Sequence, residues 1–269
     1  VMEHCANQGG FPQNGALSVR SGRSWVIEGN VIRYAKTCGL DIGSEHWDGK
    51  RIAEAVPTAK EDQRLMIGAS HLVKNCVVSD NGLCGIVGWS HQGTMIIGNV
   101  VERNNRLGFP HSRGWEEWGG IKLHNANAFI AGNLVRDNEA HGIWIDNGYR
   151  NAHITRNVIL NNLQSGIFLE LGGSNPHALV DNNIIGFTRT QGGFYTGNGV
   201  YTHDAGNITM AHNLFIANAG FGVNARVITN RRYANKLTEV SDDKILNNIF
   251  IGNCLGSICL PLDSTRVRN

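Results

Sequence analysis

The stretch Gly142-Ile143-Trp144-Ile145-Asp146 returns 24 residues later as Gly166-Ile167-Phe168-Leu169-Glu170. Both copies read glycine, aliphatic, variable, aliphatic, variable, and apolar residues that alternate with a period of two indicate a β-strand. The same five-residue unit occurs at 39–43, 85–89, 120–124, 199–203 and 222–226. Self-similarity at a period in the low twenties is typical of a repeat architecture.

A second unit places asparagine on either side of two or three aliphatic residues. It occurs at 133–138, 157–162, 213–218 and 248–253. Glycine and asparagine both tolerate positive φ, and stacked asparagine side chains can hydrogen-bond along a ladder. We therefore expect both residue types at the corners of a coil, with Asn75 and Asn99, 24 residues apart, in one corner column.

Together the two repeats predict an all-β fold, a right-handed parallel β-helix built as a single-stranded solenoid. A leucine-rich repeat would need its own leucine spacing and a helical half, and neither is present. The 269 residues allow about seven or eight turns. Residues 1–269 are expected to form one domain, either a mature segment or part of a longer protein. Intervals longer than the repeat predict inserted loops near 44–70, 103–118, 187–198 and 227–245.

Composition narrows the functional class. Charged residues make up 17% of the chain and the formal net charge is +2, which argues against nucleic acid as a partner. Apolar residues make up 41%, enough to bury a core, so disorder is not expected. No apolar run approaches the roughly 20 residues that span a bilayer, so no membrane partner is expected.

The six cysteines show neither C-x-x-C nor zinc-finger spacing, and the histidines show no metal-ligand spacing such as H-E-x-x-H. No metal site is therefore predicted. Cys38 and Cys84 each precede an equivalent glycine and are expected on neighbouring turns. There they either pair or pack as thiols, and packing is the commoner state because cysteine is among the most buried residues.

Within the glycine unit, alternation predicts that positions two and four face the core and that positions one, three and five face outward. The outward positions hold chemically capable residues in place of the small polar residues of a structural face. Position five carries Trp89, His124, Asp146, Glu170, His203 and Arg226, and position three carries Lys122, Trp144, Phe168 and Tyr201.

The repeat places Asp146 and Glu170 one turn apart in the same column. Neighbouring parallel strands lie about 4.7–4.9 Å apart, which suits the roughly 5–5.5 Å between the carboxyl groups of retaining glycosidases and not the roughly 6.5–9.5 Å of inverting ones. His124 and Lys122 would favour an ionised Asp146. Glu170, between Phe168 and Leu171, has the more apolar setting and is predicted to hold the proton.

The residues around this pair are predicted to bind substrate. Trp144, Phe168 and Tyr201 would form an apolar platform on which a pyranose stacks. Trp118 is either loop packing or a wall of the site. The column also supplies Trp89, Lys122, His124 and His203. A stacked Asp–Glu pair has other uses, since it can be solvated or bind Ca²⁺ through its oxygens; no other cofactor is predicted.

The same residues resemble glycoside hydrolase family 120, the β-helical β-xylosidases. That family reads Gly-Leu-Trp-Leu-Asp-Trp and, one turn later, Phe-Val-Glu-Val-Ser, where this chain has 142–146 and 167–171. Similar stretches lie at 2–6, 25–30, 35–39, 84–88, 119–124 and 179–183, so the resemblance covers roughly the first 190 residues.

The resemblance implies that Asp146 is the nucleophile, that Glu170 is the general acid/base and that Glu117 is a third carboxylate in the site. Two departures bear on xylose specificity more than on reaction type. Asn147 replaces the family's Trp after the nucleophile, and Gly172-Gly173 replaces its Ser-His after the acid/base.

The leading interpretation is an extracellular or periplasmic retaining glycoside hydrolase, similar to a β-xylosidase, that acts on glycosides derived from plant or algal polysaccharides. One alternative is a β-helical polysaccharide lyase or epimerase, which would use Lys122, His124, His203 or Arg226, often with Ca²⁺. Another is a non-catalytic carbohydrate-binding solenoid. The expected partner is an oligosaccharide or polysaccharide, and a second copy of the chain or an additional domain would cover the solenoid ends.

Overall fold

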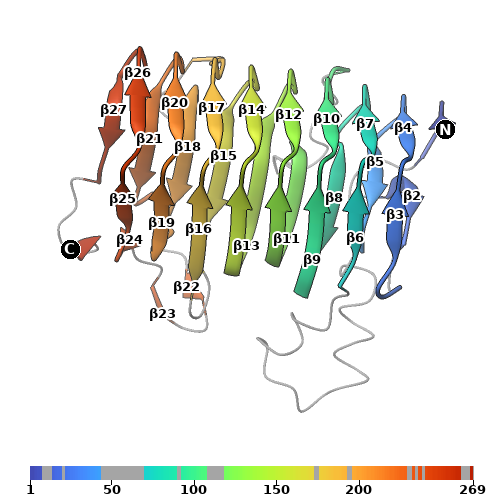
Figure 1. Cartoon of the computed structure of the whole chain (residues 1–269), viewed down its shortest axis with the longest axis horizontal. Coiled ribbons are helices and arrows are strands. Elements are labelled where there is room, and N and C mark those ends of the chain that lie inside the picture. Colours follow the sequence, from blue (N-terminus) through green and yellow to red (C-terminus); the bar gives the residue numbers. More distant parts are fainter. Residues whose placement is uncertain are drawn as a thin grey trace.

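The computed structural model of the chain describes residues 1–7, 14–19, 22–43, 70–89, 92–107, 118–172, 176–192, 196–228, 232–233, 236–237, 240–261 and 267–268. Every regular element in these residues is a β-strand, as the two-residue periodicity predicted. The strands stack side by side along one axis in sequence order (Figure 1). None of the described residues forms a helix with the length and hydropathy of a membrane span.

Sheet A is one wall of the coil and contains nine parallel strands. In order they are β1 (Met2–Glu3), β4 (Val31–Arg33), β7 (Val77–Ser79), β10 (Val100–Glu102), β12 (Leu134–Arg136), β14 (Val158–Leu160), β17 (Ile184–Gly186), β20 (Leu214–Ile216) and β26 (Ile249–Ile251).

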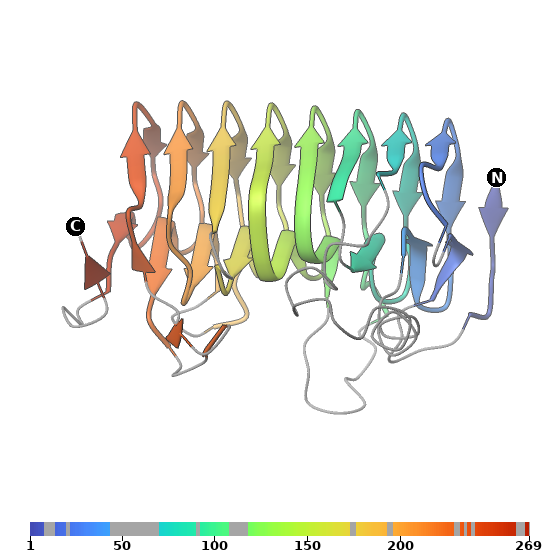
Figure 2. The same ribbon diagram turned by 90° about the horizontal axis from the view of Figure 1, so that it is seen from below.

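Sheet B is the wall that carries the glycine units. Its strands are β2 (Gly15–Ser18), β5 (Cys38–Asp41), β8 (Ile86–Trp89), β11 (Gly119–Ala131), β13 (His141–Thr155), β15 (Ser165–Glu170), β18 (Asn198–His203), β21 (Phe221–Arg226) and β27 (Gly256–Cys259). Seen from below, β2 and β27 lie toward opposite ends of the coil (Figure 2).

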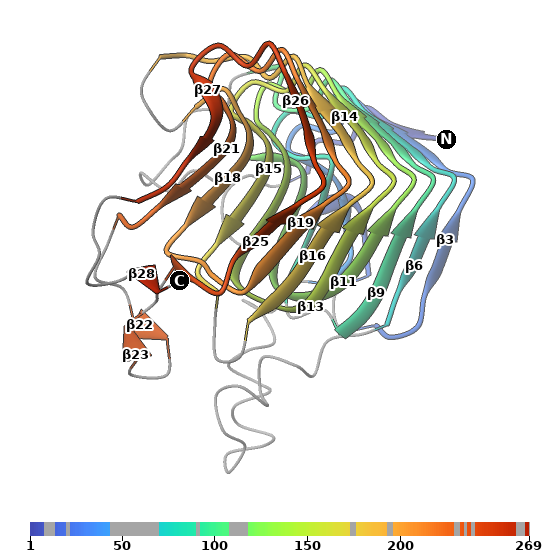
Figure 3. The same ribbon diagram turned by 60° about the vertical axis from the view of Figure 1, so that its left-hand side comes forward.

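Sheet C is the third wall and shares β11 and β13 with sheet B, because these two strands continue around the bend between the walls. Its other strands are β3 (Val26–Glu28), β6 (Leu72–Lys74), β9 (Gln92–Ile97), β16 (His177–Asp181), β19 (Ile208–Ala211) and β25 (Lys244–Leu246). Figure 3 shows sheets A and C meeting at a sharp corner. Two short pairs form separate two-stranded sheets, β22 (Arg232–Tyr233) with β23 (Lys236–Leu237), and β24 (Val240–Ser241) with β28 (Val267–Arg268).

The strand register confirms the glycine repeat, including the three long intervals. Ile121 pairs with Ile143, and Ile143 with Ile167. The intervals 39→85, 85→120 and 166→199 are likewise single turns with extra residues between them. The expected seven or eight turns are too few: sheet A has nine strands in the described residues, since the first and last turns carry no clear glycine unit.

The alternation predicted that the repeat glycines face solvent, and this prediction is wrong. A Cβ atom on Gly142 would lie 2.5 Å from the carbonyl oxygen of Gly166 and 2.9 Å from Nδ2 of Asn162. Gly142 is also not among the residues with positive φ. Glycine is needed there because the next turn approaches too closely for any side chain. The expectation of positive φ holds elsewhere, for example at Gly132 (φ 64°).

Two corners of the coil combine a residue of positive φ with a following asparagine, and the asparagines of each corner stack into a ladder. At one corner the residues of positive φ include Gly132, Arg156, Asn182 and His212, which precede Asn133, Asn157, Asn183 and Asn213. Along a ladder, the side-chain oxygen of each asparagine accepts hydrogen bonds from the asparagine one turn earlier. Asn157 Oδ1, for example, accepts from the backbone nitrogen and from Nδ2 of Asn133, both at 2.9 Å. The ladders satisfy buried polar groups that would otherwise be costly.

The expected alignment of Asn75 with Asn99 is wrong by one residue. Asn99 Oδ1 accepts the backbone N–H of Cys76 at 2.9 Å. Cys76 therefore occupies the ladder position of its turn, and Asn75 occupies the positive-φ position before it, with φ 53°.

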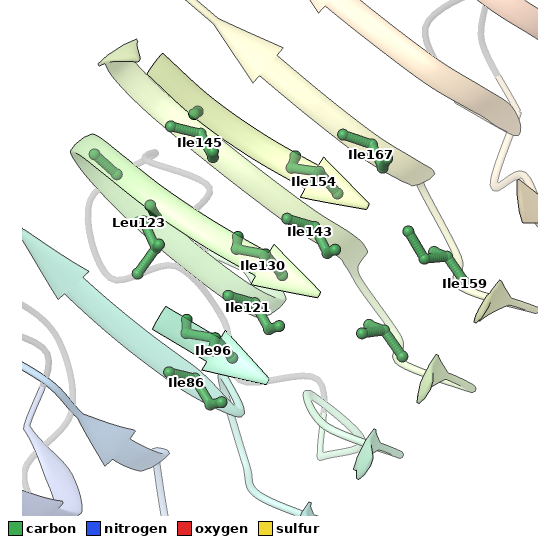
Figure 4. Close-up of a cluster of buried hydrophobic side chains, with 14 of the residues drawn as sticks. Ile86, Ile96, Ile121, Leu123, Ile130, Ile143, Ile145, Ile154, Ile159 and Ile167 are labelled. Carbon is green, nitrogen blue, oxygen red and sulfur yellow. The ribbon is translucent and has the colours of Figure 1, made fainter. Parts of the chain in front are cut away.

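The core consists of aliphatic columns that stack from turn to turn. Ile86, Ile121, Ile143 and Ile167 lie on successive strands of sheet B (Figure 4), and all four are 0% exposed. Burying such a side chain is worth roughly 1.5–3 kcal/mol relative to leaving it exposed. A slip of one residue would turn these side chains outward, so the columns hold the register of the polar residues between them.

Candidate active site

The polar column of position five lies on sheet B, immediately before the bend toward sheet C. His124 pairs with Trp89 and with Asp146, and Glu170 pairs with His203. The residues that follow, Asn147, Leu171 and Asp204, all have positive φ and make the bend. The paired residues of β13 and β15 run from Ile143 and Ile167 to Ile145 and Leu169. The next residues along these two strands are Asp146 and Glu170.

Asp146 is a buried carboxylate with two basic neighbours. Lys122 Nζ donates to Asp146 Oδ2 at 3.2 Å, and His124 Nδ1 lies 3.4 Å from the same oxygen. Asp146 is 7% exposed and Lys122 is fully buried. Asp146 Oδ1 is also buried and has no hydrogen-bond partner within the described residues. One carboxylate oxygen is therefore anchored by Lys122 and His124, and the other is enclosed by the protein.

The basic neighbours set the protonation state of Asp146. Burial raises the pKa of its carboxyl, but the charges of Lys122 and His124, the Lys122 hydrogen bond and the backbone N–H of Asn147 outweigh burial and leave the pKa below its usual value. Asp146 is therefore ionised at neutral pH, which is the state that a carboxylate nucleophile needs.

The His124 ring contacts an aromatic ring and a side-chain amide. Its ring stacks on Trp89, with centroids 3.7 Å apart and planes at 6°. Nδ2 of Asn147 lies 3.3 Å from His124 Nδ1. Asn147 was not predicted as a site residue, and its one signal in the sequence is its place directly after Asp146.

Glu170 has a histidine beside it that reaches a second carboxylate. His203 Nδ1 lies 4.0 Å from Glu170 Oε1, and His203 Nε2 lies 3.3 Å from Asp204 Oδ2. Asp204 is fully buried and accepts the backbone N–H of Ile228 at 2.8 Å. Sequence reasoning missed Asp204 because it follows the five-residue unit, on the bend.

The aromatic residues of position three form a closed stack and not an exposed platform. Lys122 Nζ lies 3.0 Å from the centroid of the Trp144 ring, the Trp144 and Phe168 centroids are 5.0 Å apart, and those of Phe168 and Tyr201 are 4.8 Å apart. Each ring is only 5% or 6% exposed. Because residues in register lie one strand spacing apart, the rings cover one another's faces and leave none for a pyranose.

His141 extends this stack. Its ring contacts Trp144 and Phe168, and its Nδ1 lies 2.7 Å from Ser165 Oγ. Burial, aided by the charge of Lys122, lowers the pKa of His141 to about 3. The ring is therefore neutral at physiological pH and contributes packing to the site.

Trp118 is the remaining predicted site residue that the structure describes. Trp118 packs against a cluster of Cys38, Leu83, Cys84 and Val87. Glu117 lies outside the described residues, as do most of the predicted loops 44–70 and 103–118 and parts of 187–198 and 227–245. The described part of the chain contains no group of three or more His, Cys, Asp or Glu residues that could hold a metal ion.

Three walls of stacked parallel strands, joined at asparagine-lined corners, define a parallel β-helix. The family described as the right handed beta helix region matches residues 15–196, and the chain belongs to this family. No curated protein matches the chain.

Solved structures with the same fold include two carbohydrate-active proteins. A complex of XylC with xylose has a TM-score of 0.62 and 22% identity, covering 88% of this chain and 38% of that one. The periplasmic alginate epimerase AlgG has a TM-score of 0.53 and 18% identity, covering 91% of this chain and 61% of that one. At these identities the similarity shows the fold alone, and this chain spans less than two thirds of either protein.

Proposed function

We propose that the chain carries the catalytic β-helix of a retaining glycoside hydrolase, with Asp146 as the nucleophile and Glu170 as the general acid/base. The observation that carries the proposal is a buried Asp146 whose carboxylate accepts a hydrogen bond from Lys122, on the strand next to the one that carries Glu170. The spacing of neighbouring parallel strands, about 4.7–4.9 Å, is close to the roughly 5–5.5 Å that retention requires.

In this mechanism the Asp146 carboxylate attacks the anomeric carbon while Glu170 gives its proton to the glycosidic oxygen. The new carbon–oxygen bond forms as the bond to the leaving group breaks, and the bonding electrons leave with the aglycone oxygen. Water, deprotonated by Glu170, then displaces Asp146, so two inversions restore the original configuration. Lys122 and His124 hold Asp146 Oδ2, which keeps the carboxylate oriented and ionised.

The proposed substrates are xylosides or related glycosides from plant or algal polysaccharides, and the proposed location is extracellular or periplasmic. The resemblance to glycoside hydrolase family 120 and the fold shared with XylC support the sugar class, and the fold shared with periplasmic AlgG supports the location. Asn147 at the place of the family's Trp points to a different fit around the sugar.

A panel of aryl and alkyl glycosides, assayed on the wild type and on Glu170→Gln, tests this function. Without its acid, the variant is expected to lose about 10²–10⁴-fold in kcat/KM on alkyl glycosides. It should keep much of its activity on dinitrophenyl glycosides, whose leaving group needs no proton. The matched control is Glu139→Gln, which removes a carboxylate paired with Arg189 at 3.0 Å outside the column; its activity should not change.

Two results would overturn the hydrolase proposal. One is an equal loss on both leaving groups in Glu170→Gln. The other is a wild-type protein that binds sugars without turning over any glycoside, which would identify a carbohydrate-binding solenoid.

A second candidate, an epimerase or lyase acting on uronates, is favoured by a different pair. Arg226 pairs with His203 in the register of β18 and β21, which puts a cation for a sugar carboxylate beside a base that can remove the neighbouring proton. The fold shared with AlgG supports this reading. Ultraviolet absorbance of an unsaturated product, or uptake of solvent deuterium into a polyuronate, especially with Ca²⁺ dependence, would favour it over hydrolysis.

A further inference from the structure

Two of the six cysteines face each other across neighbouring turns. All six are thiols in the structure, and Cys38 and Cys84 are both 0% exposed. Leu40 pairs with Ile86, and the backbone nitrogen of Gly39 donates to the carbonyl oxygen of Cys84 at 3.0 Å. Two residues back along this register, Cys38 lies opposite Cys84. Their thiols are in hydrogen-bond contact.

On the strands before and after the two cysteines, glycines occupy the same column. Gly15 pairs with Cys38 on the preceding strand. Gly119, whose carbonyl oxygen accepts the backbone N–H of Gly85, lies opposite Cys84 on the following strand. Neither Gly15 nor Gly119 adds a side chain above or below the pair. Leu83, Val87 and Trp118 complete the cluster around the two cysteines, so the pair is enclosed by apolar groups.

The spacing of the strands meets the Cα–Cα distance that a disulfide requires. Neighbouring parallel strands lie about 4.7–4.9 Å apart, inside the roughly 4.4–6.8 Å range of Cα–Cα distances across disulfides. Other cysteines lack such an opposite partner. Cys76, for example, donates its Sγ hydrogen to the carbonyl oxygens of Lys74 and Ile27, at 3.3 and 3.5 Å.

We propose that Cys38 and Cys84 are a disulfide-forming site that joins the two turns. The oxidant is a small-molecule or protein disulfide, RS–SR. One cysteine thiolate attacks it and releases RS⁻, and the second thiolate then displaces the remaining RS⁻ from the mixed disulfide. The protein loses two electrons and two protons, and two RSH form.

The burial of the two cysteines determines when the disulfide can form. The hydrogen bond from Cys84, together with burial, raises the pKa of the Cys38 thiol. The reactive thiolate is therefore scarce in the folded protein, and the sulfurs are closed to solvent. The bond should form while the chain folds, before Trp118 and Val87 pack over it. It would enclose residues 39–83, including the inserted interval 44–69, and restrict the unfolded chain.

The test is to refold the reduced protein in a glutathione redox buffer, block the remaining thiols in denaturant with N-ethylmaleimide, and identify disulfide-linked peptides by mass spectrometry. The Cys38–Cys84 peptide is expected to dominate. The oxidised protein should melt about 5–10 °C higher than the reduced one. In Cys38→Ser/Cys84→Ser the melting temperature should not depend on the redox buffer.

A variant with Cys5, Cys76, Cys254 and Cys259 all replaced by Ser keeps only the proposed pair and should still form the bond. Full labelling of Cys38 and Cys84 after oxidative refolding would refute the site, as would linkage of either residue mainly to another cysteine. If refolding yields are low, the same labelling applies to protein exported to a bacterial periplasm, where disulfides persist. Both residues fully labelled in folded, exported protein would be an equally clear refutation.

Discussion

Replacement of Asp146 by Asn is expected to lower kcat/KM on aryl glycosides by about 10⁴-fold or more. The amide keeps the shape of the side chain but cannot form the bond to the anomeric carbon. It also removes the charge that Lys122 and His124 hold at 3.2 and 3.4 Å. The loss should appear with good leaving groups as well as poor ones, because it falls on the nucleophile. In this respect it differs from Glu170→Gln.

Asp181→Asn is the matched control for this prediction. Asp181 is also bonded to a histidine, His153, at 2.7 Å, but on sheet C and away from the column. Its activity should stay within about twofold of the wild type. Azide added to Asp146→Gly should restore turnover and give a glycosyl azide of inverted configuration. Activity of Asp146→Asn within tenfold of the wild type would exclude Asp146 as the nucleophile.

Replacement of Lys122 by Met is expected to destabilise the fold by about 3–5 kcal/mol at pH 7. Lys122 is fully buried, and its removal leaves the Asp146 carboxylate buried with His124 as its remaining basic neighbour. Lys74→Met is the control, because the Lys74–Glu28 pair is 35% and 48% exposed and such surface pairs contribute about 1 kcal/mol or less. Urea denaturation measures both.

The pH dependence separates this charge effect from lost packing. The Lys122 charge lowers the pKa of Asp146, so the stabilisation from the pair is present above the unfolded pKa of about 3.9 and is lost as pH falls through the folded pKa. In Lys122→Met the charge that counteracts burial is gone, so the pKa of Asp146 rises. The stability deficit should therefore shrink between pH 7 and pH 3.

The double variant Lys122→Met/Asp146→Asn should recover most of the deficit at pH 7, because no uncompensated charge is left. A deficit of equal size at pH 4 and pH 7, or one that the second substitution deepens, would show that Lys122 acts through its contact with Trp144 alone.

Much of the fold could be predicted because it repeats. Periodic aliphatic residues such as Ile143 and Ile167 reveal the strands, and their spacing alone aligns His124 with Asp146. The side-chain directions at the ends of the strands could not be read in the same way. Simple alternation turns Gly142 outward, whereas the corner brings it against the next turn.

The sequence predicts which residues share the column of the site, but not which of their side chains contact one another. Period-two alternation identifies Trp144, Phe168 and Tyr201 as lying off the core, but it does not tell whether rings one strand apart bind a sugar or one another. Asn147 and Asp204 could not be recognised, because they lie on the bend where the repeat stops. Asn147 contacts His124 across a turn, and Asp204 accepts the backbone N–H of Ile228 across another, and no local pattern records such contacts.

The pairing of Asp146 with Glu170 is tested most directly by the configuration of the first product released from an aryl glycoside by the wild-type protein. Proton NMR spectra recorded in the first minutes of the reaction distinguish the two anomers before they equilibrate. A nucleophile and an acid/base one strand apart predict a sugar with the anomeric configuration of the substrate. A first product of inverted configuration would contradict this assignment.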